Sequence, residues 1–399
     1  MAKITIVNAH WSNRGDEAAL RPIINKLLDE KSNEVTIIFK DREEISEFPY
    51  SEVKHVSTHF LPKDINVILD CIHEKENTQI ENGLKKTVDL LRETELIIYS
   101  PGGAVISNSF WWIKQLEYLT PFICAKEFKI PIVVAAPSMG PFNQELWKNK
   151  ILKNYLNCAD KIIVRETISN HYLSKIGVDS EVTIDTAFYD AIAESSVFTI
   201  DKELGEFFEK HNKVVAMTLS DFAWNVPLKE KKELLAKNED TIEVFIDQLI
   251  KQGYGILLIP QLFGNQDDAT YLTRYYRKGV FILSNTYDTY IQQYIVSRCF
   301  ALIGMRYHSN IFAAKAGVPF IAIGYEDKMF GFMQQWELID YLLYIDHLSL
   351  DILCSKWNQL VCNHERYKYK LKKLRKIWQK KAQITVDAIL NYDKGEKGK

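Results

Sequence analysis

Short apolar runs alternate with longer amphipathic stretches along most of this chain. Each run has about four to eight residues, which suits a buried strand and is too short for a helix of a globular protein. Strands that alternate with amphipathic helices are typical of a parallel sheet covered by helices. The pattern therefore predicts an α/β fold.

The predicted strands form two series, separated by residues 193–213, which are acidic and poor in strand signals. The first series covers residues 4–8, 35–39, 96–100, 132–136 and 161–165, and the second covers residues 214–219, 255–260, 280–283, 300–304 and 320–324. A chain of 399 residues exceeds what one hydrophobic core usually serves. We therefore predict two doubly wound, Rossmann-like domains over residues 1–195 and 196–355, followed by a helical basic tail over residues 356–399.

Composition is that of a folded globular protein, with 47% hydrophobic and 26% charged residues. A formal net charge of -2 provides no general attraction for nucleic acid, so we expect no such partner. Six cysteines lie apart without a Cys-x-x-Cys pair, which predicts neither a zinc site nor a disulfide framework. The N-terminus alternates like a strand rather than a signal peptide, and no apolar run reaches about 18 residues. We therefore expect a cytoplasmic protein.

The tail is strongly basic between residues 366 and 381, yet Tyr367, Leu371, Leu374 and Trp378 fall at helical spacing on one face. One interpretation is a helix that packs back on the body and leaves its basic face in solvent. The other is a peripheral contact with the inner face of the membrane, which would suit a lipid-linked substrate.

Ligands of doubly wound sheets bind beyond the carboxyl ends of the strands, so the loops there carry the candidate site. After the first strand, Asp16 can cap the next helix and Gly15 can permit a tight entry. Asn13, Arg14 and Glu17 suit hydrogen bonds to a polar ligand such as a sugar. After residues 96–100, Gly102 and Gly103 either form a turn or let a ligand approach the backbone. No Gly-x-Gly-x-x-Gly or P-loop spacing occurs, which disfavours dinucleotide binding and P-loop hydrolysis.

Two arginines follow predicted strands at this edge. Arg165 needs an anionic partner, which is either Glu166 or Asp185 in a structural pair or a ligand carboxylate or phosphate. Arg306 stands with His308 and Ser309 where a strand gives way to a small-residue helix. Free amides at that helix start, beside an arginine and a histidine, predict an anion site with a proton donor or acceptor. Lys328, after the next strand, adds a cation near the same rim.

These loops together resemble the polysaccharide pyruvyltransferase family over roughly residues 3 to 330. The resemblance rests on Asn13-Arg14-Gly15-Asp16-Glu17-Ala18, Pro101-Gly102-Gly103, Ser138-Met139-Gly140-Pro141-Phe142, Arg165-Glu166-x-x-Ser169, Asp185-x-Ala187-Phe188, Met305-Arg306-Tyr307-His308-Ser309 and Ala316-Gly317-Val318-Pro319. It implies a GT-B-like fold, in which the two domains face each other across a cleft. It also implies transfer of a pyruvyl group from phosphoenolpyruvate to two sugar hydroxyls, giving a cyclic ketal and phosphate.

The resemblance, with the chemistry of phosphoenolpyruvate, suggests a role for each candidate residue. The donor would bind to Arg165, Arg306, Ser309 and Lys328, and the acceptor to Asn13, Arg14, Gly102 and Gly103. His308 would protonate the methylene carbon, and Asp16 or Glu17 would orient or deprotonate a sugar hydroxyl. Phosphoenolpyruvate is then a co-substrate, and we expect neither a cofactor nor a metal.

The expected acceptor is a sugar of an envelope or capsular polysaccharide precursor, with a polyprenyl-diphosphate-linked form as one option. Two alternatives stay open, a GT-B nucleotide-sugar glycosyltransferase and a non-catalytic carbohydrate-binding assembly subunit. The sequence specifies neither the acceptor sugar nor the oligomeric state.

Overall fold

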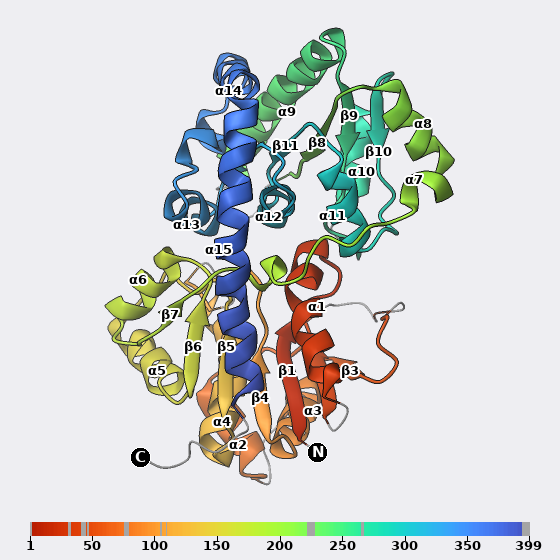
Figure 1. Ribbon diagram of the computed structural model, residues 1–399. Helices are drawn as coiled ribbons and strands as arrows, with labels where there is room; N and C mark the ends of the chain where they lie inside the picture. The colour runs from red at the N-terminus through yellow and green to blue at the C-terminus, as the bar shows by residue number, and fades with distance from the viewer. Residues whose placement is uncertain are drawn as a thin grey trace. The chain divides into compact units, whose positions relative to one another are not determined.

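The computed structural model describes residues 2–30, 33–40, 45, 48–75, 80–103, 106–108, 110–221, 228–264 and 267–392, without the side chains of residues 228–231. The chain divides into two compact units (Figure 1). Unit 1 comprises Met1–Ser12, Asp16–Tyr189 and Lys380–Lys399, and unit 2 comprises Asn13–Gly15 and Asp190–Gln379. Each unit has its own parallel sheet.

The sheet of unit 1 has seven strands in the order β3-β2-β1-β4-β5-β6-β7. Their bounds are β1 (Lys3–Ala9), β2 (Glu34–Phe39), β3 (Lys54–Ser57), β4 (Leu96–Tyr99), β5 (Ile132–Ala135), β6 (Lys161–Val164) and β7 (Glu181–Val182). Every pairing is parallel, and the central strands are near-continuous apolar runs because helices cover both faces. The strand order changes direction between β1 and β4, which is the switch point where ligands of such sheets bind.

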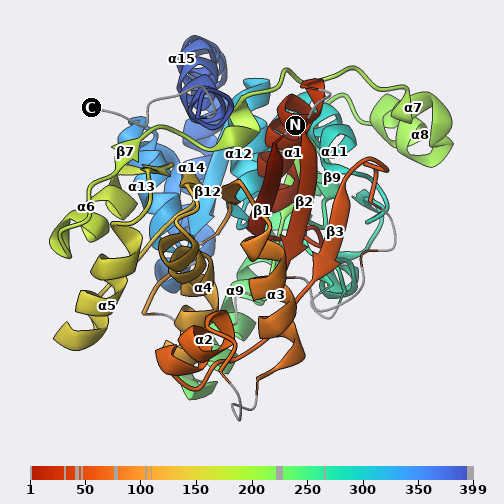
Figure 2. The ribbon, with the colours of Figure 1, turned by 90° about the horizontal axis from the view of Figure 1, so that it is seen from below.

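Helices cover the two faces of this sheet (Figures 1 and 2). They are α1 (Arg14–Asp29), α2 (Ile65–Ile72), α3 (Asn82–Arg92), α4 (Trp112–Phe128), α5 (Leu146–Leu156) and α6 (Thr167–Lys175), with a short 3-10 helix at Thr186–Phe188. One core packs Ile6 of β1 against Ile23 of α1, and the other packs Val7 against Leu119 of α4. Successive residues of β1 thus point to opposite faces, as the period of a strand requires.

The sheet of unit 2 has six strands, all parallel, in the order β10-β9-β8-β11-β12-β13. These are β8 (Val214–Thr218), β9 (Gly255–Leu258), β10 (Val280–Ile282), β11 (Ala301–Gly304), β12 (Phe320–Gly324) and β13 (Leu342–Tyr344). Its helices are α7 (Val197–Ile200), α8 (Lys202–Lys210), α9 (Leu228–Lys251), α10 (Asp268–Leu272), α11 (Thr289–Ser297), α12 (Tyr307–Ala316), α13 (Asp327–Gln335), α14 (Leu350–Cys362) and the first part of α15 (His364–Leu390), with 3-10 helices at Thr273–Tyr275, Ile339–Tyr341 and Ile345–His347. Both sheets therefore have the doubly wound topology that the sequence predicted.

The boundary between the units differs from the predicted one. Unit 2 begins at Asp190, whereas the prediction began the second domain at residue 196. The Tyr290 hydroxyl donates to Asp190 Oδ2 at 2.8 Å within unit 2. Residues 13–15 also belong to unit 2, although the prediction placed them in the first domain. The sequence missed β3, β7 and β13, which lie toward the sheet edges and have only two to four residues.

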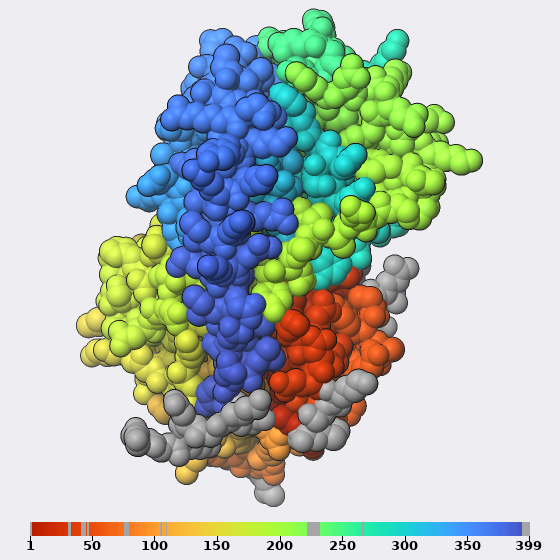
Figure 3. Space-filling view, in the orientation of Figure 1, coloured from red at the N-terminus to blue at the C-terminus, as the bar shows by residue number. Residues whose placement is uncertain are grey.

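The basic tail is not a separate domain, because α15 is divided between the units at Lys380. Within unit 2 its apolar face is buried, with Tyr367 stacked on Tyr341 at 4.0 Å and Trp378 at 5.7 Å from Trp336. Figure 3 shows other parts of the helix at the molecular surface. Residues 393–399 of the predicted tail lie outside the described residues. In the part of the chain described above, no helix combines the length and apolarity needed to cross a membrane.

Candidate functional site

The turn after β11 is held by side chains from the helix that follows it. Asn310 Nδ2 donates to the backbone oxygens of Gly304 at 3.1 Å and Arg306 at 3.0 Å. Ser309 Oγ donates to the Arg306 oxygen at 2.7 Å and lies 2.6 Å from the Thr218 hydroxyl. Ser309 was predicted to bind the donor, but its hydroxyl proton is already used within the turn. Asn310, a fully buried amide in a helix of small residues, was missed by the sequence reasoning.

Arg306 is a cation held in one place at this turn. Its Nη2 atom donates to Asp268 Oδ1, and Asp268 Oδ2 accepts from the amides of Gln261 and Leu262, both at 3.0 Å. Burial alone would lower the pKa of Arg306, but the neighbouring Tyr325 and Asp268 raise it. Among the described residues, Arg306 Nε has no hydrogen-bond partner. The guanidinium therefore stays charged and keeps a donor for a ligand.

His308 lies beside Arg306 in the first turn of α12, with 7% of its surface exposed. Its ring packs against Gly15, since a Cβ atom on Gly15 would lie only 2.0 Å from His308 Nδ1. The Tyr307 ring meets the imidazole edge-on, at 5.2 Å between centroids. Gly15 is thus required for close approach to the histidine, beyond the helix entry that the sequence indicated.

Asn13 and Arg14, at the entry to α1, contact the segments that follow β9 and β10 in the same unit. Asn13 forms a β-bridge with Leu262, and the Arg14 amide donates to the Gln261 oxygen at 2.9 Å. Arg14 Nη2 donates to the Asn285 oxygen at 2.9 Å, and the guanidinium lies 4.3 Å from the Phe263 ring centroid. The sequence grouped Asn13 and Arg14 with the acceptor. Their contacts place Arg14 near Gln261, whose backbone amide donates to Asp268, and acceptor binding by Asn13 and Arg14 stays a prediction.

Lys328 lies in the first turn of α13, after β12. Its Nζ atom is 2.5 Å from Glu326 Oε2, and its side chain is 18% exposed. An ammonium group has three donors, so one ion pair leaves others for a ligand. Unit 2 thus carries three of the predicted cations. Arg306 follows β11, Lys328 follows β12, and Arg14 contacts the loop after β9.

Arg165, the predicted donor residue of unit 1, is completely buried. Its Nη1 atom donates to Asp185 Oδ2 at 2.7 Å, its Nε donates to Ser138 Oγ at 2.8 Å, and Glu166 Oε2 lies 3.4 Å away. This is the structural pair that the sequence offered as one of two alternatives. A direct contact with the donor stays a prediction.

The two carboxylates after β1 have different surroundings. Glu17 is fully buried and pairs with Arg21 at 2.6 Å. Asp16 is 9% exposed, and across the described residues it has no hydrogen bond or ion pair. A Cβ atom on Gly102 would lie 3.1 Å from Asp16 Oδ1, and Gly102 has a φ of 148° that suits glycine. Gly103 follows it, half-buried. Of these two carboxylates, Asp16 is therefore the one without an ion pair among the described residues, and its acid–base role stays a prediction.

A buried ionic cluster that the sequence did not reveal lies at the carboxyl ends of β2 and β3. Lys40 Nζ is 3.0 Å and His59 Nδ1 is 3.6 Å from Glu117 Oε1, and Lys114 pairs with Oε2 of the same carboxylate. Burial would raise the pKa of Glu117, but these three partners lower it to about 2. No local motif marks the cluster, because its members come from three separate segments.

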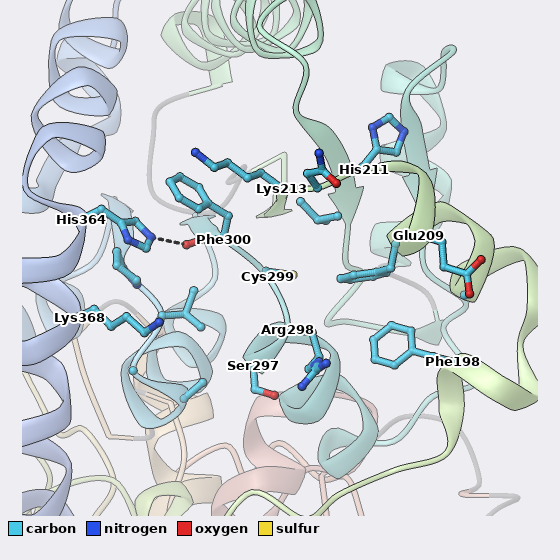
Figure 4. Close-up of a pocket in the computed structure, with 18 of the residues that line it drawn as sticks. Phe198, Glu209, His211, Lys213, Ser297, Arg298, Cys299, Phe300, His364 and Lys368 are labelled. Atoms are coloured by element: carbon cyan, nitrogen blue, oxygen red, sulfur yellow. Dashed lines mark hydrogen bonds between the residues drawn. The ribbon is translucent and has the colours of Figure 1, made fainter.

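A cavity of about 870 Å³ lies at the opposite edge of the unit 2 sheet (Figure 4). Its lining includes Lys213, Phe300 and Pro319, which directly precede β8, β11 and β12. His364 Nε2 lies 2.9 Å from the Phe300 oxygen there. The cavity is therefore separate from the strand ends that carry Arg306 and His308. Over the described residues, no three His, Cys, Asp or Glu side chains gather as metal ligands.

Comparisons with solved structures agree with a fold of two parallel-sheet units. Among solved structures, UDP-GlcNAc 2-epimerase from Neisseria meningitidis bound to UDP-GlcNAc is similar with a TM-score of 0.62 and 12% identity, covering 98% of this chain and 100% of that one. A putative UDP-N-acetylglucosamine 2-epimerase from Listeria monocytogenes has a TM-score of 0.61 and 10% identity, covering 100% and 99%. Identities this low show the fold alone, which is GT-B-like.

Sequence comparisons identify the family. The amylovoran biosynthesis protein AmsJ of Erwinia amylovora is 23% identical over 413 residues, covering 91% of this chain and 93% of AmsJ. The family model of polysaccharide pyruvyl transferase matches residues 13–327, which include both Arg14 and the turn of Arg306 and His308. The chain therefore belongs to the polysaccharide pyruvyl transferase family and is a transferase of polysaccharide biosynthesis.

Proposed function

We propose that the protein transfers the pyruvyl group of phosphoenolpyruvate to two hydroxyls of one sugar in an envelope or capsular polysaccharide precursor. The products are a cyclic pyruvate ketal and inorganic phosphate. The observation that carries the proposal is that Arg306 and His308 lie next to one another at the start of α12, on the carboxyl edge of the unit 2 sheet. The reaction needs a fixed cation and a proton donor next to one another.

Phosphoenolpyruvate brings a phosphate and a carboxylate, so its site requires at least two cationic contacts. Arg306 and the free amides of the first turn of α12 supply one anion site. Arg14, held against Gln261 and Asn285, supplies the second cation within the same unit, and Lys328 adds a third. This assignment replaces Arg165 as the main second contact, since the Arg165 guanidinium is buried against Asp185.

The reaction balances with these residues alone. One sugar hydroxyl adds through its oxygen to C2 of phosphoenolpyruvate while His308 gives a proton to the methylene carbon, which becomes a methyl group. The second hydroxyl then displaces phosphate from C2, and its proton leaves with the phosphate. Asp16 takes the proton of the first hydroxyl, as a carboxylate without an ion pair among the described residues. The scheme requires neither a metal nor a cofactor.

The test is phosphate release from phosphoenolpyruvate across a panel of galactosides and mannosides, with the product examined for a ketal. We expect release with the wild type and a loss of about 100-fold or more in Arg306→Ala and His308→Ala. Consumption of a nucleotide sugar without phosphate release from phosphoenolpyruvate would instead identify a glycosyltransferase. Acceptor binding without turnover, unchanged in His308→Ala, would identify a carbohydrate-binding subunit.

A further inference from the structure

The N-terminal ends of α4 and α5 expose large apolar side chains. Trp111 is 86% exposed, Leu146 is 72%, Trp147 is 51% and Ile113 is 37%. Single exposed apolar residues are ordinary on protein surfaces, but a group of neighbouring ones marks an interaction site. None of these four side chains belongs to the turn of Arg306 and His308 or to the ionic cluster of Glu117.

Contacts between the two helices bring their N-terminal ends together. The Trp112 and Trp147 rings are 5.4 Å apart, and Gln115 Nε2 donates to Gln144 Oε1 at 3.1 Å. Helices α4 and α5 lie side by side in both ribbon views (Figures 1 and 2). Because they follow β4 and β5, their N-terminal ends lie at the carboxyl edge of the unit 1 sheet.

The charges around this apolar group are mostly positive. Helix α5 carries Lys148, Lys150 and Lys153 and no acidic residue. Lys148 lies over the Trp147 ring at 5.3 Å and also pairs with Glu145 at 2.8 Å. Lys150 is exposed and, within the described residues, has no ion pair. Exposed tryptophans beside lysines match the boundary between lipid headgroups and acyl chains.

We propose that Trp111, Ile113, Leu146 and Trp147, with Lys148 and Lys150, form a surface that binds an anionic lipid membrane. The indole and aliphatic groups enter the headgroup boundary, and the lysines contact lipid phosphates. A second copy of the chain fits less well, because a two-fold contact would bring the same lysines against each other. The membrane contact thus lies on unit 1, whereas one of the two interpretations of the basic tail placed a membrane contact there.

This surface also narrows the substrate class, a consequence that rests on the proposed function. Asp16 and Gly102 follow β1 and β4 at the same sheet edge, where the acceptor is expected. A membrane contact at that edge favours an acceptor saccharide anchored to a lipid over one free in solution. The membrane-binding surface and the predicted acceptor residues Asp16 and Gly102 would then lie toward the same side of the lipid bilayer.

The test is co-sedimentation with vesicles of phosphatidylcholine and phosphatidylglycerol, and with vesicles of phosphatidylcholine alone. We expect binding to the anionic vesicles, about tenfold weaker in Trp111→Ala/Trp147→Ala and about fivefold weaker in Lys150→Ala. The matched control is Ile200→Ala/Tyr276→Ala, which removes apolar groups 77% and 71% exposed in unit 2, and it should bind like the wild type. No binding by the wild type, equal binding of all variants, or loss only in Lys372→Glu/Lys373→Glu of the tail would overturn the proposal.

Activity separates this inference from the proposed function. Trp111→Ala/Trp147→Ala should release phosphate at the wild-type rate with a water-soluble glycoside and lose rate only with a vesicle-anchored acceptor. A wild type that binds vesicles but releases no phosphate with any acceptor refutes the proposed function and leaves the membrane surface standing. A dimer of the wild type that the double substitution dissociates, by light scattering, would show that a second copy occupies the surface.

Discussion

Arg14 is held by three contacts within unit 2, two of them hydrogen bonds to the backbone oxygens of Gln261 and Asn285. If it binds the donor, Arg14→Ala should raise the KM for phosphoenolpyruvate about tenfold, since a hydrogen bond to a charged group contributes about 1.5–3 kcal/mol. The KM for the acceptor should change little. Steady-state kinetics with each substrate varied in turn measures both. A rise confined to the acceptor would return Arg14 to the role that the sequence suggested.

Glu117 illustrates how a buried charge depends on its partners. Glu117→Gln leaves Lys40 buried without its carboxylate, so the free energy of unfolding should fall by about 3–5 kcal/mol. Urea unfolding of the variant against the wild type checks this value. The control is Glu145→Gln, whose pair with Lys148 is exposed and screened by solvent, so its loss should change the free energy of unfolding far less. Similar losses in both variants would contradict a special role for the cluster.

The same carboxylate gives a pH dependence. Its pKa is about 2 in the folded protein against an ordinary value of 4.5, so its stabilisation is present above pH 4.5 and is lost as the pH falls toward 2. The loss amounts to about 3 kcal/mol. Unfolding measured at several pH values between these limits should show a steeper decline in the wild type than in Glu117→Gln. Parallel curves would mean that Glu117 titrates normally.

At the scale of elements, the first turns of α1 and α12 depend on one another. The backbone of Gly15 lies against the ring of His308, and Gly15→Ala would place a methyl group 2.0 Å from Nδ1. The imidazole must then move, which should lower kcat about 100-fold, because small misplacements of a reacting group cost about this much. Phosphate release measures the effect. A kcat of Gly15→Ala equal to that of the wild type would contradict this dependence.

For the whole molecule, the donor residues are predicted to act within one unit. Phosphoenolpyruvate should slow hydrogen exchange of the amides of Arg14, Gln261 and residues 305–310, all in unit 2, and leave β6 and the amide of Arg165 unchanged. Ligand binding slows hydrogen exchange of the backbone amides that it orders. The Arg165 side chain is already held by Asp185, so we expect no further ordering there. Exchange mass spectrometry with and without phosphoenolpyruvate is the measurement. Equal protection around Arg165 would restore it as a donor ligand.

The alternation of apolar runs and amphipathic stretches was enough to predict both sheets, because that pattern depends on neighbours a few residues apart. The ten predicted strands all form, and the turn of Arg306 and His308 begins a helix as expected. Edge strands such as β3 were missed because their exposed residues lack the apolar signal.

Only the tertiary structure decided which charged groups meet. Arg14 contacts a residue 271 positions away, Lys40 pairs with a residue 77 positions away, and Arg165 pairs with Asp185. Each is a polar residue after a strand, and the sequence alone could not tell a ligand contact from a structural ion pair. The periodicity of a chain specifies which face each residue occupies, whereas long-range partners depend on how loops from distant strands pack at one sheet edge. The sequence thus determined the sheets and the strand-to-helix turn of Arg306 and His308, and packing decided which cations are paired within the protein.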